Sequence, residues 1–258
     1  MIPDPCAALV ERSDPDRFLA TMAAPPSARL RLWPLYAYNI EIARAPYASS
    51  EPLVAEMRLQ WWIDLIEGIG QGARSPKGDI GEALSALLQS TPIPPGLLSG
   101  MAEARRWEVW REPFADRAHF DDFIDATAGN LMWAACLALG APTHAETVVR
   151  DFAWGAGLAS WLAAVPELAA RGRRPLVDGG AAAVADLARE GLARIARARQ
   201  SRHLVPRSAI PALWAGWQTR ALLKQAAKTP ARVVEGTLAT TDFAKKTTLI
   251  LRAATGYW

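Results

Sequence analysis

The chain has 258 residues, of which 51% are hydrophobic and 21% charged, and its formal net charge is +3. This composition excludes an intrinsically disordered chain and allows a sizeable buried core. Alanine and leucine are abundant, β-branched runs are few, and no apolar–polar alternation is long enough for a strand. We therefore expect an all-α protein.

Pro and Gly separate the predicted helices, and no linker or repeat divides the chain, so we expect one domain over residues 1–258. Asp14 can accept the first hydrogen bonds of a short helix, and Pro46 stops a longer one before it. In chain order, helices are expected from Asp14 to Met22, from Pro26 to about Arg44, and from Pro52 to near Gly68. A loop from Gly70 to Gly78 follows, then a helix that continues to about Ser90, and then a helix from Leu97 to Arg111.

Two later stretches, Ala126 to Gly140 and Phe152 to Val165, carry no charged residue. A helix that is apolar all round is buried on every side or lies in a membrane. Both stretches are shorter than the roughly 20 residues of a membrane span, so we expect paired central helices of a bundle. From Ala181 the remaining helices are predicted to be amphipathic and basic, with breaks around Pro206, Pro211 and Pro230.

The charge is unevenly distributed along the chain. Residues 171–258 contain 16 Lys or Arg against 5 Asp or Glu, whereas residues 1–170 contain 13 against 21. A basic half is compatible with an anionic membrane surface or an acidic partner, but we favour solvated helix faces that close onto the acidic half. No nucleic-acid partner is expected, because no recognition motif accompanies the basic residues.

The first residues, "MIPDPCAALVERSDPDRF", do not pair a basic segment with an apolar one, so we predict no signal peptide. Cys6 and Cys136 are isolated, which is typical of a reducing compartment. A cytoplasmic protein is expected, with peripheral contact at the inner membrane as a further option.

One acidic cluster, "DDFID", contains Asp121, Asp122 and Asp125. Carboxylates on one helix face can hold Mg²⁺ bridged to a diphosphate. The alternative, which we favour, is that these acids occupy the first turn of the buried helix that follows, where free N–H groups need acceptors. The three histidines, His119, His144 and His203, have no partner at metal-ligand spacing, so no histidine metal site is expected.

Three segments, taken in order, resemble the squalene/phytoene synthase family: "PPSARLRLWPLYAY", "FIDATAGNLMWAACLALG" and "GLASWLAAVPELAARGRRPLV". The resemblance extends from about Asp14 to Pro211. It implies an isoprenoid-synthase-type bundle of helices around a central cavity. It also implies two aspartate-rich motifs that face this cavity and hold the Mg²⁺ ions on which loss of diphosphate depends.

This chain departs from both motifs. Matched residue by residue, the metal-binding positions of the first motif fall on Ala43, Arg44 and Tyr47, and those of the second on Ser160, Ala164 and Leu168. Alanine cannot bind Mg²⁺, and a guanidinium repels it with about 4 kcal/mol per unit charge at 4 Å and an effective dielectric of 20. We therefore expect no catalytic metal and no cofactor.

The segments "YNIEIARA" and "EMRLQWWIDLIEG" resemble the branch of this family that includes an assembly factor for respiratory complex I. The main hypothesis is a non-catalytic helper that binds a lipid, a prenyl chain or a respiratory-complex subunit. The expected polar site at the cavity mouth consists of Tyr36, Asn39, Glu41, Arg44 and Arg58. Alternatively, Asn39 and Glu41 only form hydrogen bonds with neighbouring helices.

The second hypothesis is an active Mg²⁺-dependent transferase of farnesyl or geranylgeranyl diphosphate. Its metal would be held by Asp121, Asp122 and Asp125, together with Asp64 or Glu67.

Overall fold

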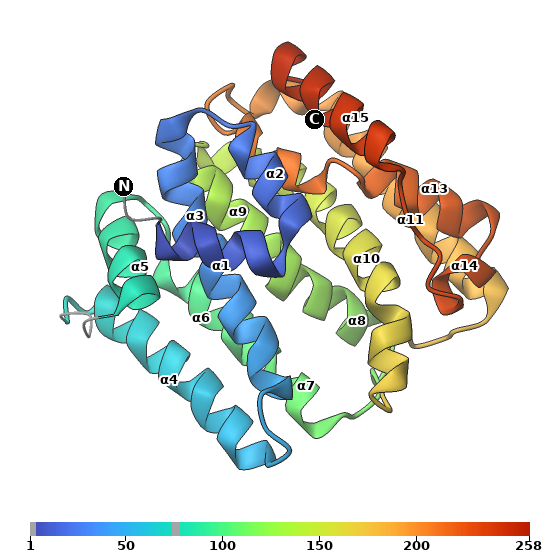
Figure 1. Cartoon of the computed structure of the whole chain (residues 1–258), viewed down its shortest axis with the longest axis horizontal. Helices are drawn as coiled ribbons and strands as arrows, with labels where there is room; N and C mark the ends of the chain where they lie inside the picture. The colour runs from blue at the N-terminus through green and yellow to red at the C-terminus, as the bar shows by residue number, and fades with distance from the viewer. Residues whose placement is uncertain (1–3, 74–77) are drawn as a thin grey trace.

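The computed structural model describes residues 4–73 and 78–258. Every regular element in these residues is a helix, which confirms the all-α prediction (Figure 1). The elements are α1 (Pro5–Ser13), α2 (Pro15–Met22), α3 (Pro26–Arg44), η1 (Ala45–Tyr47), α4 (Pro52–Gly70), α5 (Asp79–Ser90), α6 (Pro95–Ala104), α7 (Arg106–Trp110), α8 (Arg117–Ile124), η2 (Asp125–Gly129), α9 (Asn130–Ala138), η3 (Thr143–Ala145), α10 (Glu146–Ala170), α11 (Ala181–Gln200), η4 (Arg202–Leu204), α12 (Ile210–Leu213), η5 (Trp214–Gly216), α13 (Thr219–Lys228), α14 (Ala231–Val234) and α15 (Asp242–Thr255).

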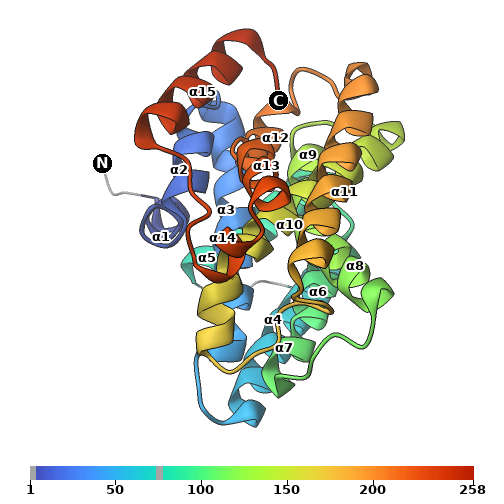
Figure 2. The same ribbon diagram turned by 90° about the vertical axis from the view of Figure 1, so that its right-hand side faces the viewer.

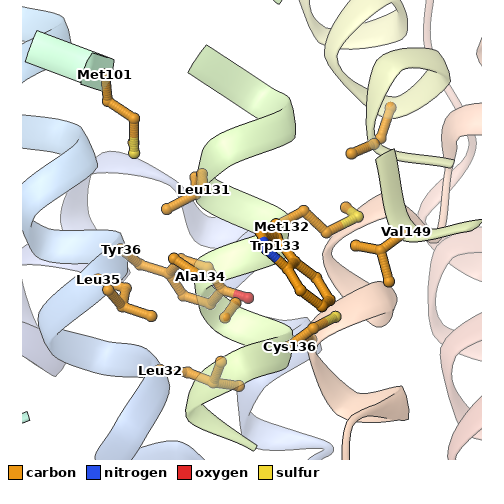
Figure 3. Packing of buried hydrophobic residues seen from close by; sticks show 14 of the residues in the cluster. Leu32, Leu35, Tyr36, Met101, Leu131, Met132, Trp133, Ala134, Cys136 and Val149 are labelled. Carbon is orange, nitrogen blue, oxygen red and sulfur yellow. The ribbon is translucent and has the colours of Figure 1, made fainter. Parts of the chain in front are cut away.

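The two uncharged stretches form the centre of the bundle, as predicted. All residues from Leu131 to Ala138 in α9 are buried, and α10 buries 14 of its 25 residues. Figure 1 shows α9 and α10 in the interior, with α3 and α4 to one side and α11 and α13 to the other. Figure 2 turns this view by 90°. Figure 3 shows Leu32 and Tyr36 of α3 pointing toward α9, with Tyr36 beside Ala134. One hydrophobic core cluster extends in this way from Cys6 to Trp258.

No helix within the described residues is long and apolar enough to cross a lipid bilayer.

Local sequence explains most of the observed helix ends. The Asp14 side chain accepts a 3.0 Å hydrogen bond from the backbone N of Arg17, which confirms it as the cap of α2. Prolines occupy the first positions of α3 and α4, where a missing N–H costs nothing. Of the predicted loop from Gly70 to Gly78, residues 74–77 lie outside the described residues.

Two expectations about the helices were wrong. The first helix was expected to begin at Asp14, yet an earlier one, α1, precedes it, and Asp4 caps α1 by accepting hydrogen bonds from the backbone N of Cys6 and Ala7. The single helix expected from Leu97 to Arg111 is divided at Arg105. There the backbone N of Glu108 bonds to the carbonyl of Arg105 at 3.0 Å, a tighter i to i+3 pattern that ends α6 and starts α7.

The favoured position of the acidic cluster was also wrong. The helix that contains the cluster begins at Arg117, and Asp116 caps it by accepting a 2.8 Å bond from the backbone N of His119. Asp121 and Asp122 therefore lie beyond the first turn, and Asp125 begins the π-helical turn η2. Because Asp116 already accepts at the helix start, the cluster has no capping role.

Candidate functional site: a cavity between α3 and α10

A cavity of about 860 Å³ lies between α3 and α10, with η2 and α9 along its inner wall. Its inner lining is apolar and includes Phe123, Leu131, Met132 and Trp161. The π-helical turn makes room at this wall, because it widens the backbone where Thr127 and Ala128 meet the cavity.

A close helix approach sets the width of the cavity. A Cβ atom at Gly157 of α10 would lie 2.5 Å from the Cβ of Ala128 and 3.0 Å from Cγ2 of Ile124. Only glycine permits this approach, so α10 can pack directly on η2 in the cavity wall, which all three residues line.

The structure brings the predicted site residues together. All five residues of the expected polar site and all six degenerate motif positions line this one cavity; they are Tyr36, Asn39, Glu41, Ala43, Arg44, Tyr47, Arg58, Ser160, Ala164 and Leu168, with Arg44 in both groups. The first motif positions lie at the end of α3 and in η1, and the second lie on α10, on the other side of the cavity. Figure 1 shows α3 and α10 on the two sides of α9.

The acids of the alternative metal site do not line the cavity. Asp121 forms a 2.9 Å ion pair with Arg117, and Asp125 forms a 2.9 Å ion pair with Arg150. Asp122 is exposed, and neither Asp64 nor Glu67 lines the cavity. The structure therefore separates this acidic cluster from the site positions.

Arginines neutralise three of the four acids that line the cavity. Glu108 has a side chain only 2% exposed, and it pairs with Arg105 at 2.5 Å while accepting a 2.7 Å hydrogen bond from the hydroxyl of Tyr47. Burial and the neighbouring Glu108 raise the pKa of Tyr47, so its hydroxyl remains a donor. Tyr47, which the sequence resemblance matches to a metal-binding carboxylate, thus donates a hydrogen bond to the buried carboxylate of Glu108.

The other two acids are paired in the same manner. Glu167 forms a 2.5 Å ion pair with Arg171, whose guanidinium lies 4.6 Å from the ring centre of Tyr47. This stacking joins the end of α10 to η1 across the cavity mouth. Asp14 contacts Arg17 at 3.2 Å. Glu41 alone among the four acids has no arginine partner within the described residues.

Several polar groups of the lining have no partner in the described part of the chain. Asn39 and Glu41, both half-buried, make no side-chain hydrogen bond there. No hydrogen bond between described residues thus supports the alternative in which these two side chains bond neighbouring helices. Nη1 of Arg17 and Nε of Arg105 are buried and also have no hydrogen-bond partner.

Arg44 and Arg58 are exposed at the cavity mouth. Arg44 donates a 2.6 Å hydrogen bond to Oγ of Ser13, and Arg58 forms no ion pair with a described residue. Tyr36 lies further in, only 2% exposed, with the Arg17 guanidinium 5.1 Å from its ring centre. Burial raises the pKa of Tyr36, so its phenol stays neutral and can donate into the cavity.

The lining does not fit a pair of Mg²⁺ clamps. Mg²⁺ requires oxygen ligands in near-octahedral geometry, usually with one or two carboxylates in addition to phosphate. At the motif positions the cavity offers alanine on both sides, Ala43 and Ala164, and Glu41 is the only carboxylate not already paired with an arginine. Five arginines against four acids instead give the lining an excess of positive charge, which favours an anionic group.

The sequence analysis missed Arg17, Arg105, Glu108 and Arg171 as site residues. The helix motif around Arg171 was recognised, but its contact with Tyr47 spans two helices far apart in sequence. Arg105 and Glu108 stand at i and i+3, a spacing that predicts a pair. The pair lines the cavity because the chain breaks between α6 and α7, where one continuous helix was expected.

A comparison with protein families finds that residues 10–178 match the model described as squalene/phytoene synthase. Among solved structures, the chain resembles a dehydrosqualene synthase with bound ligand, at a TM-score of 0.80 and 14% identity, over 96% of this chain and 94% of that one. It also resembles the squalene synthase HpnC from Alicyclobacillus acidocaldarius, at a TM-score of 0.75 and 13% identity, over 88% of this chain and 93% of that one. At these identities the likeness shows the isoprenoid synthase fold.

Two curated proteins also match. The complex I assembly factor 6 of Homo sapiens is 20% identical over 162 residues, 62% of this chain and 48% of that protein. Its homolog from Drosophila melanogaster is 36% identical over 63 residues, 24% of this chain and 19% of that protein. The matched parts thus span about half and about a fifth of these relatives.

Proposed function

Because the chain belongs to the squalene/phytoene synthase family, we propose that it is a non-catalytic binding member of that family. Its cavity binds a lipid or prenyl chain with an anionic head group, and arginines rather than Mg²⁺ hold that head group. The single observation that carries this proposal is the composition of the two motif faces, where alanine, arginine, tyrosine, serine and leucine stand instead of carboxylates.

The polarity of the cavity supports this class of ligand. The apolar inner wall suits a hydrocarbon chain, because its burial removes apolar surface from water. At the mouth, Arg44 and Arg58 have no acid partner among the described residues, and the buried nitrogens of Arg17 and Arg105 have no acceptor among them. A phosphate oxygen would supply those acceptors.

The loss of catalysis follows from the charge at the leaving group. As a diphosphate departs, negative charge builds up on it in the transition state and must be neutralised. In metal-dependent transfer the divalent ions supply the neutralising positive charge. Arginines can bind the diphosphate, but binding of the ground state alone does not lower the barrier. Binding without turnover is the expected result.

A ligand experiment tests the binding. Farnesyl monophosphate is titrated into the protein in the presence of EDTA, and binding is followed by tryptophan fluorescence, to which Trp161 in the cavity wall contributes. Arg44→Gln/Arg58→Gln should weaken binding by about a hundredfold or more, since each of the two lost charge-assisted contacts is worth about 1.5–3 kcal/mol and 1.4 kcal/mol is a factor of ten. Arg12→Gln/Arg174→Gln removes two exposed arginines outside the lining and should leave binding unchanged.

An activity experiment tests the absence of catalysis. The protein is incubated with farnesyl or geranylgeranyl diphosphate and Mg²⁺, and released diphosphate is measured. No release above the buffer rate is expected. Release that Asp122→Ala abolishes would support the alternative, an active prenyl transferase whose metal lies at the acidic cluster. The family and fold are compatible with that alternative.

A second function within the same proposal is assembly-type assistance to a respiratory complex. It is favoured by the similarity of the chain to the two complex I assembly factor 6 proteins. The expected observation is that a complex I subunit co-purifies with the tagged protein from its native cells. The subunit should be absent when the same purification is made from cells without the tagged protein. Recovery of no respiratory subunit would remove this second function and leave the ligand proposal intact.

A further inference from the structure

A second concave site lies at the outer edge of the bundle, away from the cavity. This groove of about 1350 Å³ lies between the segment from Arg202 to Trp214 and the C-terminal half of α15. It shares no lining residue with the cavity. Figures 1 and 2 show α15 at the periphery, beyond α2 and α13.

The groove contains a buried arginine without an acid partner. Arg252 of α15 is only 8% exposed, and its Nη1 has no hydrogen-bond partner in the described part of the protein. Burial and the nearby Arg199 lower the pKa of Arg252 to about 10. A desolvated guanidinium without an aspartate or glutamate partner among the described residues destabilises the free protein, which favours binding of an anion from outside.

Further arginines gather around the same place. The guanidinium groups of Arg199 and Arg202 each lie 5.2 Å from the ring centre of Tyr257, and Arg202 and Arg207 line the groove with exposed side chains. Nε of Arg199 donates to the backbone oxygen of Trp258 at 3.0 Å. No described aspartate or glutamate forms an ion pair with any of these arginines or with Arg252.

The preceding turns of α11 show that this lack of acids is local. Arg194 pairs with Glu190 at 3.0 Å, and Arg197 pairs with Asp151 at 3.1 Å. Among the described arginines of α11, those before Arg199 are thus paired with acids. Arg199, next to the groove, has no aspartate or glutamate partner among the described residues.

We propose that this groove is a second ligand site, which binds a phosphate-type oxyanion through Arg202, Arg207 and Arg252. The planar guanidinium fork matches the geometry of phosphate oxygens and can bind them in pairs. Phosphate would supply the acceptors that the protein itself does not provide there. The inference does not depend on the function proposed for the cavity, because the two sites share no residue.

The phosphate can belong to a lipid head group or to a soluble molecule. Exposed apolar side chains beside the groove are relevant to which of the two it is. Leu251 lines the groove at 63% exposure, and Phe243 and Ile250 stand on α15 at 78% and 67%. Exposed apolar side chains beside a cluster of arginines are the pattern of a helix that lies on an anionic lipid surface. The chemistry at the arginines is the same for both sources.

The first experiment measures thermal unfolding with increasing inorganic pyrophosphate. Arg202→Gln/Arg207→Gln should lower the affinity for pyrophosphate that underlies the stabilising response by about tenfold or more, the loss expected for one to two charge-assisted contacts. Lys224→Gln/Lys228→Gln removes the same charge from the exposed face of α13 and should leave the response unchanged. The same titration of Arg44→Gln/Arg58→Gln measures the share of the response that comes from the cavity, and a response lost in this variant but retained in Arg202→Gln/Arg207→Gln overturns the proposal. Equal loss in the lysine control, or no response in the wild type, overturns the proposal.

The second experiment distinguishes the two sources. Wild-type protein is sedimented with phosphatidylcholine vesicles that contain or lack phosphatidylglycerol. Sedimentation that requires phosphatidylglycerol and is lost in Arg202→Gln/Arg207→Gln assigns the site to a lipid head group. A pyrophosphate response without sedimentation assigns it to a soluble phosphate compound.

Arg252→Met tests the buried member of the site. Without phosphate this variant should unfold at a higher temperature than the wild type, because it removes an unpaired buried charge at similar volume. Its response to pyrophosphate should decrease. A variant that unfolds at a lower temperature and keeps the full response would show Arg252 to be structural only and would overturn its assignment.

Discussion

The hydroxyl of Tyr47 lies 2.7 Å from Oε2 of Glu108, so a residue at a degenerate metal position holds the most buried acid of the cavity. Glu108 is further bound by Arg105. Tyr47 therefore has a structural role at this position, because it supplies a hydrogen bond to a buried carboxylate. Restoring an aspartate at position 47 would place two carboxylates side by side and repel them.

Tyr47→Phe tests this contact. The substitution leaves one oxygen of a carboxylate only 2% exposed without its donor, so the free energy of unfolding should fall by about 1–3 kcal/mol. Urea denaturation measures the change. Tyr257→Phe is the control, because the Tyr257 hydroxyl bonds no described residue, and it should change stability little. Equal effects of the two variants would contradict a specific role for Tyr47.

Ala43→Asp/Ala164→Asp tests the metal-free reading of the cavity. These positions lie on opposite sides of it, so two aspartates recreate carboxylates that face each other. Mg²⁺ should then tighten binding of farnesyl thiodiphosphate by about tenfold or more, whereas the wild type should show no dependence on Mg²⁺. Ala43→Asn/Ala164→Asn keeps the volume without the charge and serves as control. Dependence on Mg²⁺ in the wild type would count against the proposal.

Gly157→Ala tests the close packing of α10 on η2. Its added methyl group would lie 2.5 Å from the Cβ of Ala128, so either the helices separate or the π-helical turn shifts. The free energy of unfolding should fall by about 1–3 kcal/mol, the usual range for overpacking. Gly179→Ala meets no atom within 4 Å and should be close to neutral. Urea denaturation of the two variants gives the comparison.

Glu190 links α8 to α11 and should contribute to the acid sensitivity of the fold. Burial acts to raise its pKa, but hydrogen bonds from Arg117 and Arg194 outweigh burial and lower it below the ordinary 4.5. A lowered folded-state pKa gives stability that is present above 4.5 and is lost as the pH falls through the folded value.

Glu190→Gln should therefore reduce stability at neutral pH and flatten the loss of stability in acid. Urea unfolding at a series of pH values measures both effects. Glu235→Gln, at an exposed position without an ion pair in the described residues, should keep the wild-type slope. If Glu190→Gln leaves the slope unchanged, other carboxylates cause the acid sensitivity.

The sequence by itself predicted the all-α class, the central pair of helices and ten of the residues that line the main cavity. Periodicity and the absence of charge between Ala126 and Gly140 were sufficient for a buried helix, since burial of a helix is encoded in its own side chains. The positions at Ala43 and Ala164 were predicted to face one cavity from a family resemblance, and both do.

Tertiary structure alone decided which charges are compensated. Tyr47 and Glu108 are 61 positions apart, and Arg117 and Glu190 are 73 apart. From the sequence, Asp121 and Asp125 were expected to be metal ligands or to lie in the first turn of a helix. In the folded protein they form ion pairs with Arg117 and Arg150. The sequence gives no sign that Arg252 differs from the other basic residues of an amphipathic helix, yet its side chain is buried in the fold. The physical reason is that an ion pair depends on separation in space over a few ångströms, which the order of residues along the chain does not specify.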